Sequence, residues 1–515
     1  MNPGQESSPL AARLAELAQA QPDQLALRWR QLGAAPAAQP MQSDRARLWR
    51  RIERMTGHLQ ARWGVGVGDR VAWLGLNHEL QLVALIACAR LGAMLVPLNY
   101  RLALPELAQV LDDAQARLLV HDAAHATAAQ ALAAPGRAVC PQEALIEQAS
   151  PRGLMRPAVQ ADMPVLLVYT SGTTGRAKGA VHTQATLLAN ARASAWAHGF
   201  VPGDRVLSCL PLFHVGGLCI QTLPALLFGL EVVLHDRFEA GAWLQEMALT
   251  RPTLSLLVPA TLRAVQSHPD WERTDLSGLR GMMTGSSTIP LPYLAAFHAR
   301  GVPVGQVYGT TETGPVSVVL RLPDAQARAG AAGWPQPEAQ LQLRDAQGQE
   351  VPSGQTGEVW LRAANLMRGY WDPSGRTGVG LQDGWFGTGD LGVQDADGCL
   401  HIVGRSKDMI ISGGENIYPA EIENLLVTLP GVAECAVVGM PDPRWGEVPV
   451  AVLVRSEDAM GAALQADAVL AHLQDRIARF KLPRRVAFLP QLPKSALGKV
   501  LKAPLQALLA EPPSA

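Results

Sequence analysis

The residues best suited to chemistry form a loop rich in glycine, serine and threonine at positions 169–179. This segment reads Tyr-Thr-Ser-Gly-Thr-Thr-Gly-Arg-Ala-Lys-Gly and holds three glycines, four Ser/Thr hydroxyls and two cations. Glycines let backbone N–H groups approach phosphate oxygens, while the hydroxyls and Lys178 add donors and charge. Residues 164–168 predict a buried strand before the loop, and residues 183–190 predict the start of a helix after it. This order of strand, loop and helix predicts a polyphosphate site.

The loop differs from the common nucleotide-binding pattern G-x-x-x-x-G-K-[ST]. Gly175 is followed by Arg176, and Lys178 is followed by Gly179. A solvated surface turn is the alternative interpretation, because Gly, Ser and Thr are ordinary turn residues. The paired cations and the density of donors favour phosphate binding over a plain turn.

Two carboxylates in later motifs suit other parts of a nucleotide. Glu312 lies in Val-Tyr-Gly-Thr-Thr-Glu-Thr, residues 307–313, after a strand-like segment. Magnesium bound to a triphosphate usually takes one or two protein carboxylates and keeps several waters. Asp390 lies in Trp-Phe-Gly-Thr-Gly-Asp-Leu, residues 385–391. Taken singly, each motif is equally typical of a polar, glycine-rich turn.

Composition excludes several other functions. The chain has 515 residues, enough for about three core-sized units. It is 48% apolar and 17% charged, which is typical of a globular protein and not of a disordered one. The net charge of −1 gives no electrostatic argument for binding nucleic acid or an anionic membrane. The six cysteines form no C-x-x-C pair, which favours reduced thiols over disulfides or a zinc site.

The sequence contains no predicted targeting or membrane segment. Residues 1–9 are polar and lack the basic and apolar parts of a signal peptide. The longest apolar stretch, residues 216–234, is interrupted by Gln221, Pro224 and Glu231, so it predicts buried elements and not a membrane span. We therefore expect a cytoplasmic protein.

Helices and strands alternate along the chain, which predicts an α/β fold with doubly wound parallel sheets. Residues 128–161 are rich in Ala, Pro and Gln and predict a surface connection, and both chain ends are predicted to be disordered. The expected helices are residues 10–21, 44–63, 80–91 and 105–113, and the expected strands are residues 71–75, 94–98, 117–120, 205–210, 232–235 and 253–258.

Five motifs together resemble those of the adenylate-forming superfamily, which includes acyl-CoA synthetases, aryl-CoA ligases, adenylation domains of peptide synthetases and beetle luciferases. They are the three motifs above, residues 404–423 with Gly-Arg-Ser-Lys-Asp, and residues 493–499 with Pro-Lys-Ser-Ala-Leu-Gly-Lys. The resemblance implies a large N-terminal AMP-binding domain, residues 1–406, of layered α/β sheets with a distorted β-barrel portion. It also implies a small mobile C-terminal α/β domain, residues 407–515, with the active site between the two.

The resemblance also implies roles for individual residues. Lys499, Glu312, Thr173 and Lys178 would be catalytic, with Glu312 as the metal ligand. His214, Gly217 and Leu218 would line the acyl pocket, Gly413, Gly414 and Trp445 the CoA tunnel, and Lys407 would be the hinge. ATP or AMP contacts are implied for Thr170, Ser171, Gly172, Thr173, Thr174, Gly175, Lys178, Gly285, Ser286, Ser287, Tyr308, Gly309, Thr310, Thr311, Asp390, Arg405 and Lys499.

One departure from the family pattern and one open assignment concern details of the site. Ser286 and Ser287 stand where the family usually has a Gly-Gly-Ala type segment beside adenine and the acyl group. Near the C-terminus, a basic group predicts either a dock for CoA phosphates or a solvated face. Its members are Arg479, Lys481, Arg484 and Arg485.

The implied function is an ATP-dependent carboxylic acid–CoA ligase that uses ATP, Mg²⁺ and coenzyme A. It would form an acyl-adenylate and then an acyl-CoA thioester from a medium-chain fatty or aryl-type acid. Three alternatives remain open: an o-succinylbenzoate-type ligase of menaquinone synthesis, an adenylating enzyme that passes the acyl group to a carrier protein or to oxygen, and a non-catalytic nucleotide-binding protein. The expected partners are the small acid and CoA, with no nucleic acid, and a homodimer is a further expectation.

Overall fold

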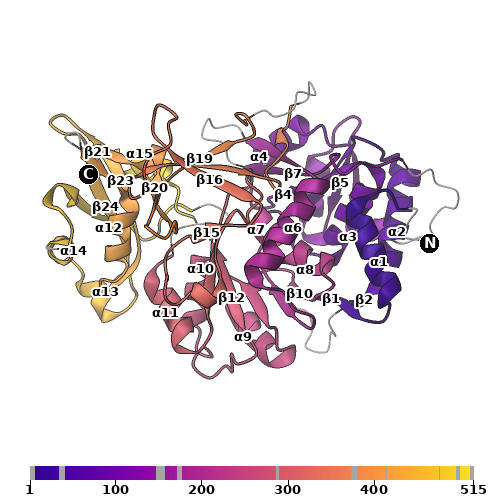
Figure 1. Ribbon diagram of the computed structural model, residues 1–515, viewed down its shortest axis with the longest axis horizontal. Helices are drawn as coiled ribbons and strands as arrows, with labels where there is room; N and C mark the ends of the chain where they lie inside the picture. The colour runs from indigo at the N-terminus through magenta and orange to yellow at the C-terminus, as the bar shows by residue number, and fades with distance from the viewer. Residues whose placement is uncertain are drawn as a thin grey trace.

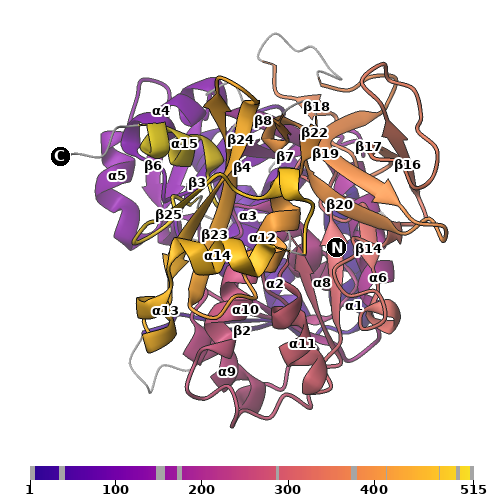
Figure 2. The ribbon, with the colours of Figure 1, turned by 90° about the vertical axis from the view of Figure 1, so that its left-hand side faces the viewer.

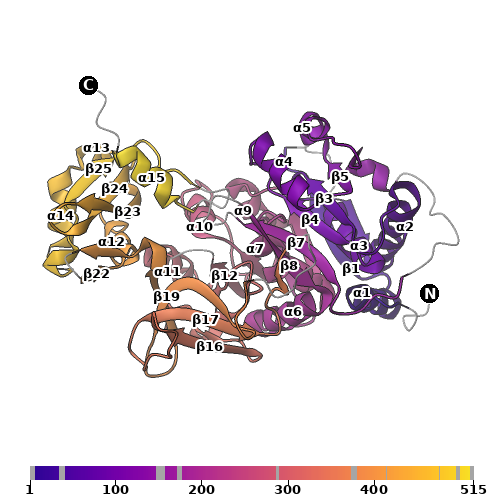
Figure 3. The same ribbon diagram turned by 90° about the horizontal axis from the view of Figure 1, so that it is seen from above.

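The computed structural model describes residues 6–33, 41–146, 157–170, 177–285, 289–372, 380–412, 415–474, 476–494 and 499–510. The molecule is elongated, with the N-terminal helices toward one end and the C-terminal segment at the other (Figure 1). Seen from above, the C-terminal part stands as a separate lobe beside the rest of the chain (Figure 3).

A nine-stranded sheet forms the middle of the large part. Its six strands from β13 to β1 are parallel, and β15, β14 and β2 are antiparallel strands at its edges. In spatial order the strands are β15 (Trp334–Pro335), β14 (Val318–Leu320), β13 (Val304–Tyr308), β12 (Gly281–Gly285), β11 (Leu254–Leu256), β9 (Arg205–Ser208), β10 (Glu231–His235), β1 (Leu25–Arg30) and β2 (Met41–Asp44).

A seven-stranded sheet forms the N-terminal side. The five strands from β7 to β6 are parallel, whereas β8 and β18 add to the edge in antiparallel fashion. The predicted parallel pairing is therefore confirmed for most of both sheets and wrong for the strands β14, β15 and β2 of the first sheet and β8 and β18 of the second. In spatial order the strands are β18 (Gly369–Tyr370), β8 (Lys178–Thr183), β7 (Pro164–Thr170), β4 (Met94–Leu98), β3 (Arg70–Leu74), β5 (Leu118–His121) and β6 (Ala138–Pro141).

The expected surface connection at residues 128–161 is wrong in part, because it contains strand β6. Val139 and Cys140 pair with Leu119 and Val120 of β5, so the hydrogen-bonding edge of β5 recruits a segment that lacks a strong strand pattern of its own.

Helices cover the sheets and fill the space between them. Every residue of α3 is buried, because this helix lies in an apolar cluster that also takes in strands of both sheets. The helices of the large part are α1 (Pro9–Ala20), α2 (Arg45–Trp63), α3 (Glu79–Leu91), α4 (Leu104–Asp113), α5 (Ala126–Ala131), α6 (Gln184–His198), α7 (Val215–Gly217), α8 (Leu223–Leu227), α9 (Ala240–Leu249), α10 (Pro259–Gln266) and α11 (Leu291–Ala299).

A four-stranded antiparallel sheet stands where the resemblance implied a distorted barrel. It lies between the large α/β part and the C-terminal lobe, and its last strand leads directly into that lobe (Figures 1 and 3). Its strands are β16 (Ala339–Arg344), β17 (Gly357–Ala363), β19 (Phe386–Gln394) and β20 (Leu400–Arg405).

The C-terminal lobe has a hydrophobic core of its own. Strands β23 and β24 carry apolar residues on both faces; α12 and α14 pack on one face and α15 on the other. Figure 2 shows this lobe in front of the larger part. The α/β class with a large and a small part is thus confirmed. The elements of the lobe are β21 (Ile410–Ser412), β22 (Glu415–Ile417), α12 (Pro419–Leu426), β23 (Val432–Asp442), β24 (Gly446–Arg455), α13 (Ala459–Ala463), α14 (Ala466–Leu473), β25 (Arg485–Phe488) and α15 (Lys502–Ala510).

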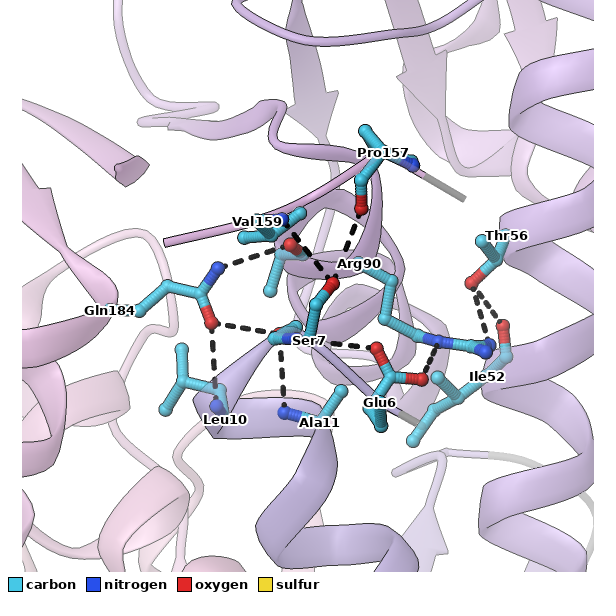
Figure 4. Close-up of polar contacts among 12 residues, drawn as sticks. Glu6, Ser7, Leu10, Ala11, Ile52, Thr56, Arg90, Pro157, Val159 and Gln184 are labelled. Carbon is cyan, nitrogen blue, oxygen red and sulfur yellow. Dashed lines mark hydrogen bonds and ion pairs between the residues drawn. The ribbon is translucent and has the colours of Figure 1, made fainter. Parts of the chain in front are cut away.

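Residues 6–8, here called the N-terminal strap, are held by polar contacts, which corrects the expected disorder of this part of the tail (Figure 4). Glu6 forms a buried ion pair with Arg90 of α3, at 2.9 Å. Ser7 accepts a hydrogen bond from the Val159 backbone N–H and donates to the Pro157 carbonyl. Ser8 caps α1 and donates to Gln184 at the start of α6, at 2.7 Å. The strap therefore joins helices to the segment that leads into β7.

Among the helices that the structure describes, none is both long and apolar enough to cross a membrane. The apolar stretch at residues 216–234 is instead divided among short helical segments and β10, as its polar interruptions predicted.

Candidate active site

The predicted phosphate loop connects two antiparallel strands, so the expected order of strand, loop and helix is wrong. Residues 178–183 form β8, which pairs back along β7 before α6 begins. The buried apolar residues Ala180 and Val181 favour a strand, which extends over the end of the predicted loop and the residues before the predicted helix. The predicted helix start is confirmed, with Thr183 as its N-cap. Ser171, Gly172, Thr173, Thr174 and Gly175 lie outside the described residues.

Thr170 and Lys178 flank that loop at the ends of the two strands. They are Cα partners in the β7–β8 ladder, which places both at the mouth of the loop. The exposed Lys178 ammonium lies 5.1 Å from the centre of the Tyr370 ring. A cation over an aromatic face is attracted by the ring quadrupole, so this contact orients Lys178.

Tyr370 also touches Glu312 and was missed by the sequence analysis. Its hydroxyl donates a hydrogen bond to Glu312 Oε1 at 2.9 Å. Burial and the Glu312 carboxylate raise the pKa of the Tyr370 phenol, so it remains a donor at neutral pH. The sequence carries no clear signal for this role, because only the pairing of β18 with β8 brings Tyr370 here.

Backbone contacts hold the segment that carries Glu312. Burial lowers the pKa of His182 to about 4, so its ring is neutral, and Nε2 lies 2.8 Å from the Thr311 carbonyl. The Thr310 N–H donates to Thr313 Oγ1 at 2.9 Å. Gly309 has no room for a side chain, since a Cβ would lie 2.6 Å from the Pro315 carbonyl oxygen. Hydrogen bonds to backbone groups, and a glycine where no side chain fits, therefore fix the conformation of this loop.

Asp390 sits inside strand β19 and not in a glycine-rich turn. Only 6% of its surface is exposed. The Arg405 Nε lies 3.0 Å from Oδ1, because Asp390 and Arg405 face each other in the β19–β20 ladder. The Tyr308 hydroxyl donates to Oδ2 at 3.0 Å. Each carboxylate oxygen has a further lone pair, so Asp390 keeps acceptor capacity for a ligand.

Gly285 ends β12 directly beside the strand that carries Tyr308. It pairs with Val307, whose carbonyl oxygen would lie 2.5 Å from a Cβ at this position. Glycine is therefore required by the close approach of the two strands. Ser286 and Ser287, the two residues that depart from the family habit, lie outside the described residues.

The charges of the Asp390 carboxylate and the Arg405 guanidinium both shift the pKa of the Lys499 ammonium. Burial lowers the pKa of its ammonium to about 8, and the Arg405 charge acts in the same direction. The carboxylates of Asp390 and Asp408 raise it, and Lys407 lowers it further. The structure thus places residues of β19, β20 and the far end of the chain close enough for their charges to influence one another.

His214, Gly217 and Leu218 come from one segment that leads into a short π-helix, Leu218–Thr222. Burial, together with the Arg101 charge, lowers the pKa of His214 to about 4. Its ring contacts Phe213, and the Arg101 guanidinium lies over the Phe213 ring. A Cβ on Gly217 would lie 2.2 Å from the Pro211 carbonyl oxygen. Since π-helices often occur at functional sites, this segment is a suitable pocket wall.

The predicted hinge residue Lys407 lies at the entry to the C-terminal lobe, and the predicted CoA-tunnel residue Trp445 lies within it. Lys407 is exposed in the 3-10 turn Ser406–Asp408, between β20 and β21. Trp445 lies in the β23–β24 turn, with the Arg444 and Arg484 guanidinium groups 4.9 Å and 5.7 Å from its ring centre. Gly413 and Gly414 lie outside the described residues. In the basic group, Lys481 pairs with Glu421 at 2.7 Å, so part of its charge is already compensated.

Asp395, Cys399 and His401 have the geometry of a metal site elsewhere, at the β19–β20 turn, with ligand atoms within 4.8 Å of one another. However, Arg328 pairs with the Asp395 carboxylate at 2.8 Å. Burial and the Asp395 charge also raise the pKa of the Cys399 thiol, which disfavours the thiolate that metals bind. This cluster is better explained as a turn held by an ion pair.

Comparison with known proteins matches both parts of the chain. The family described as AMP-binding enzyme matches residues 14–371, and the one described as AMP-binding enzyme C-terminal domain matches residues 421–499. An indoleacetate–CoA ligase from Aromatoleum aromaticum is 46% identical over 89% of this chain and 92% of its own length. A feruloyl-CoA synthase from Amycolatopsis is 42% identical over the same shares. A long-chain-fatty-acid–CoA ligase, FadD13 of Mycobacterium tuberculosis, is 34% identical over 86% and 88%.

Solved structures agree with the whole fold. The ATP-bound form of MatB from Rhodopseudomonas palustris superposes with a TM-score of 0.88 at 30% identity, covering 98% of this chain and 99% of that one. The apo form of the same protein gives a TM-score of 0.78 at 31% identity over the same shares.

Proposed function

The chain belongs to the AMP-binding enzyme family, and from this premise we propose that it activates an aryl-type carboxylic acid. It is an AMP-forming acid–CoA ligase whose substrates are ATP, used with Mg²⁺, the acid and coenzyme A. The convergence of Lys499, Asp390 and Arg405 from distant segments is the structural observation that best supports the assigned site.

In the first step, a carboxylate oxygen of the acid attacks the α-phosphorus of ATP. The bond between that phosphorus and the bridging oxygen breaks, and pyrophosphate leaves. The protein needs no nucleophile of its own, because alignment and charge neutralisation do the work. We assign Asp390 to the ribose hydroxyls and the Lys499 ammonium to the charge between carboxylate and α-phosphate.

The other end of ATP faces the loop between β7 and β8. We assign the phosphates to this loop and to Lys178, with Glu312 as a magnesium ligand alongside phosphate oxygens and water. The Glu312 carboxylate is partly exposed, and among the described residues it receives a hydrogen bond from Tyr370 alone, so it retains lone pairs that a hard cation prefers. Magnesium would supply charge neutralisation of the phosphates.

In the second step, the CoA thiolate attacks the acyl carbon, the thioester bond forms, AMP leaves and the thiol proton passes to solvent. We propose that the lobe formed by residues 407–515 rotates about Lys407 between the steps, which withdraws Lys499 and brings Gly413, Gly414 and Trp445 toward the acyl group. The better superposition on the ATP-bound form of MatB than on its apo form supports the view that the present pose belongs to adenylation.

The aryl character of the acid rests on sequence identity and on the pocket wall. The two aryl-acid relatives described above are 46% and 42% identical, against 34% for the fatty-acid relative. Aromatic rings of Tyr100 and Phe213 lie 5.3 Å apart beside His214, and aromatic surfaces suit a flat ring better than a long alkyl chain.

Cellular context is also a proposal. A cytoplasmic location is supported by the six cysteines, all of which are free thiols. The homodimer rests on the resemblance alone, and sedimentation would measure it.

The test is acid-dependent exchange between ATP and labelled pyrophosphate, followed by CoA-dependent release of AMP. Indole-3-acetate or ferulate should exceed octanoate and palmitate by at least about tenfold in kcat/KM. A fatty acid as the fastest substrate would refute the aryl proposal but leave the ligase intact. Release of ADP and orthophosphate would refute the ligase itself, and exchange without a response to CoA would favour a carrier-protein acceptor.

A further inference from the structure

A group of three charged residues links the large part to the C-terminal lobe at a distance from the proposed hinge. Arg263, on α10, donates a hydrogen bond to the Ala433 carbonyl at 2.7 Å and lies 3.6 Å from Glu434 Oε1, on β23. Lys494 approaches the same oxygen at 2.6 Å. We call Arg263, Glu434 and Lys494 the interdomain triad.

Glu434 is the member that both cations of the triad approach. Its partly buried carboxylate is stabilised by these two positive charges. About a quarter of its side chain, 27%, is exposed. Its second oxygen, Oε2, is inaccessible to solvent, and no hydrogen-bond donor among the described residues reaches it. A carboxylate in this position depends on nearby positive charge, because burial without such compensation is costly.

Lys494 connects the triad to the segment that ends at Lys499. Lys494 and Val500 form an antiparallel bridge, and the Leu501 N–H donates to the Pro493 carbonyl at 2.8 Å. These contacts close the base of the loop that carries Lys499. Fixing Lys494 on Glu434 therefore fixes one side of that base relative to β23.

The three members divide unequally between the two parts of the molecule. Glu434 and Lys494 both belong to the C-terminal lobe and keep their contact when the lobe rotates. Arg263 belongs to the large part, so rotation of the lobe about Lys407 would separate it from Glu434 and Ala433. The Arg263 contacts consequently contribute free energy to one pose, the pose in which the charges of Asp390 and Arg405 act on the Lys499 ammonium.

We propose that the interdomain triad positions Lys499 for adenylate formation, with Arg263 holding the lobe in place and Lys494 holding the base of the Lys499 loop. Glu434 and its partners are positioning residues, since they lie outside the residues assigned to bind the acid, ATP and coenzyme A. This inference rests on the proposed role of Lys499 and on the proposed rotation. It adds a state-dependent contact that favours the first half-reaction over the second.

The experiment measures the two half-reactions separately in the full-length enzyme. Adenylate formation is followed by pyrophosphate exchange with the acid that exchanges fastest in the panel above. Thioester formation is followed with the purified acyl-adenylate of that acid plus CoA. Arg263→Glu places a like charge beside Glu434 and should slow adenylate formation about tenfold. Thioester formation should stay within about twofold of wild type or become faster.

Two further variants separate the triad from a general loss of structure. Glu434→Gln keeps the shape of the side chain and should slow adenylate formation about threefold, again sparing the second step. Arg273→Glu is the matched control, because it makes the same charge change nearby on a side chain that is 76% exposed. It should leave both half-reactions unchanged.

The outcomes distinguish this inference from the proposed function. Equal slowing of both half-reactions by Arg263→Glu, or no slowing of either, overturns the positioning role while the ligase stands. Loss of the second step alone also overturns it. If wild-type enzyme forms no AMP with any acid of the panel, the proposed function fails and the inference fails with it.

Discussion

At the scale of single residues, the site depends on how the protein controls charge on a few groups. In its proposed role, Lys499 carries a proton that neutralises the reacting carboxylate and phosphate, yet burial and Arg405 make that proton easier to lose. The side chains of Tyr370 and His182, by contrast, are neutral at pH 7, because burial raises the pKa of the Tyr370 phenol and lowers the pKa of the His182 imidazole. Each of them contacts the segment that carries Glu312. Sequence motifs identify Lys499 and Glu312 but do not predict these pKa shifts.

The lowered pKa of Lys499 predicts a pH dependence. An ammonium with a pKa of about 8, below the ordinary 10.5, loses its proton as the pH rises through 8. For adenylate formation, kcat/KM should therefore fall above pH 8, since this parameter reports the free enzyme. In kcat the same limb should lie at higher pH, because bound phosphates favour the charged lysine.

Replacement by arginine checks the assignment. Lys499→Arg should be slower but should lose the alkaline limb, since a guanidinium stays charged across this range. Lys502→Arg, which changes a lysine in the neighbouring α15, should keep the limb. An unchanged limb in Lys499→Arg would assign the pKa to another group.

At the scale of elements, antiparallel strands that extend a parallel sheet determine which residues come into contact. Strand β8 turns the phosphate loop into a hairpin, and β18 then brings Tyr370 beside Lys178 and Glu312. The N-terminal strap has a similar joining role, because it links α3 and α6 to the segment before β7. These connections are long-range, so local sequence patterns do not predict them.

The strap makes a testable contribution to stability. Glu6 and Arg90 side chains are only 5% and 3% exposed, so Glu6→Ala leaves a buried guanidinium without its carboxylate. Removing one partner of an enclosed pair costs about 3–5 kcal/mol, and we expect about 2 kcal/mol here because the strap can move away from α3 and admit water. The melting temperature should fall by about 2 °C in a thermal scan.

Glu16→Ala is the control for this variant. Glu16 belongs to an exposed ion pair with Arg13 on α1, at 3.3 Å, and such pairs contribute little. An equal fall in melting temperature in Glu6→Ala and Glu16→Ala would show that the buried ion pair of the strap stabilises the protein no more than an exposed ion pair does.

At the scale of the whole molecule, the proposed two-step reaction requires two arrangements of the two parts of the chain. The C-terminal lobe has a core of its own, and it joins the large part through β20 and the turn Ser406–Asp408. A lobe with an independent core can rotate without unfolding, provided that the connecting backbone changes conformation.

Rotation predicts opposite defects for two variants. Lys499→Ala should lower adenylate formation by about 10²-fold and spare thioester formation from supplied acyl-adenylate. Lys407→Pro should do the reverse, because proline restricts the backbone that has to turn. Lys407→Gln, which keeps backbone freedom, is the control and should affect neither step strongly. Equal loss of both half-reactions in the two variants would contradict the two-pose scheme.

Much of the fold was predictable because its signals are local. Amphipathic and apolar periodicity identified α2, α3 and β4 to within a residue or two. Strands β6 and β8 were not recognised, because each is short and depends on pairing with a neighbouring strand, β5 for β6 and β7 for β8. The candidate site follows the same division: the motif residues Asp390 and Lys499 were named in advance, whereas Tyr370 and the interdomain triad were not.

The sequence by itself determined the class of fold, the family and the chemical types in the site, since each depends on residue order and spacing along the chain. Only the tertiary structure decided which of those residues meet, with what charge, and which contacts span the two parts. The physical reason is that proximity and burial arise from packing between distant segments. The Lys499 pKa depends on Arg405 and Asp390, and the Arg263 contact depends on a lobe that begins far along the chain.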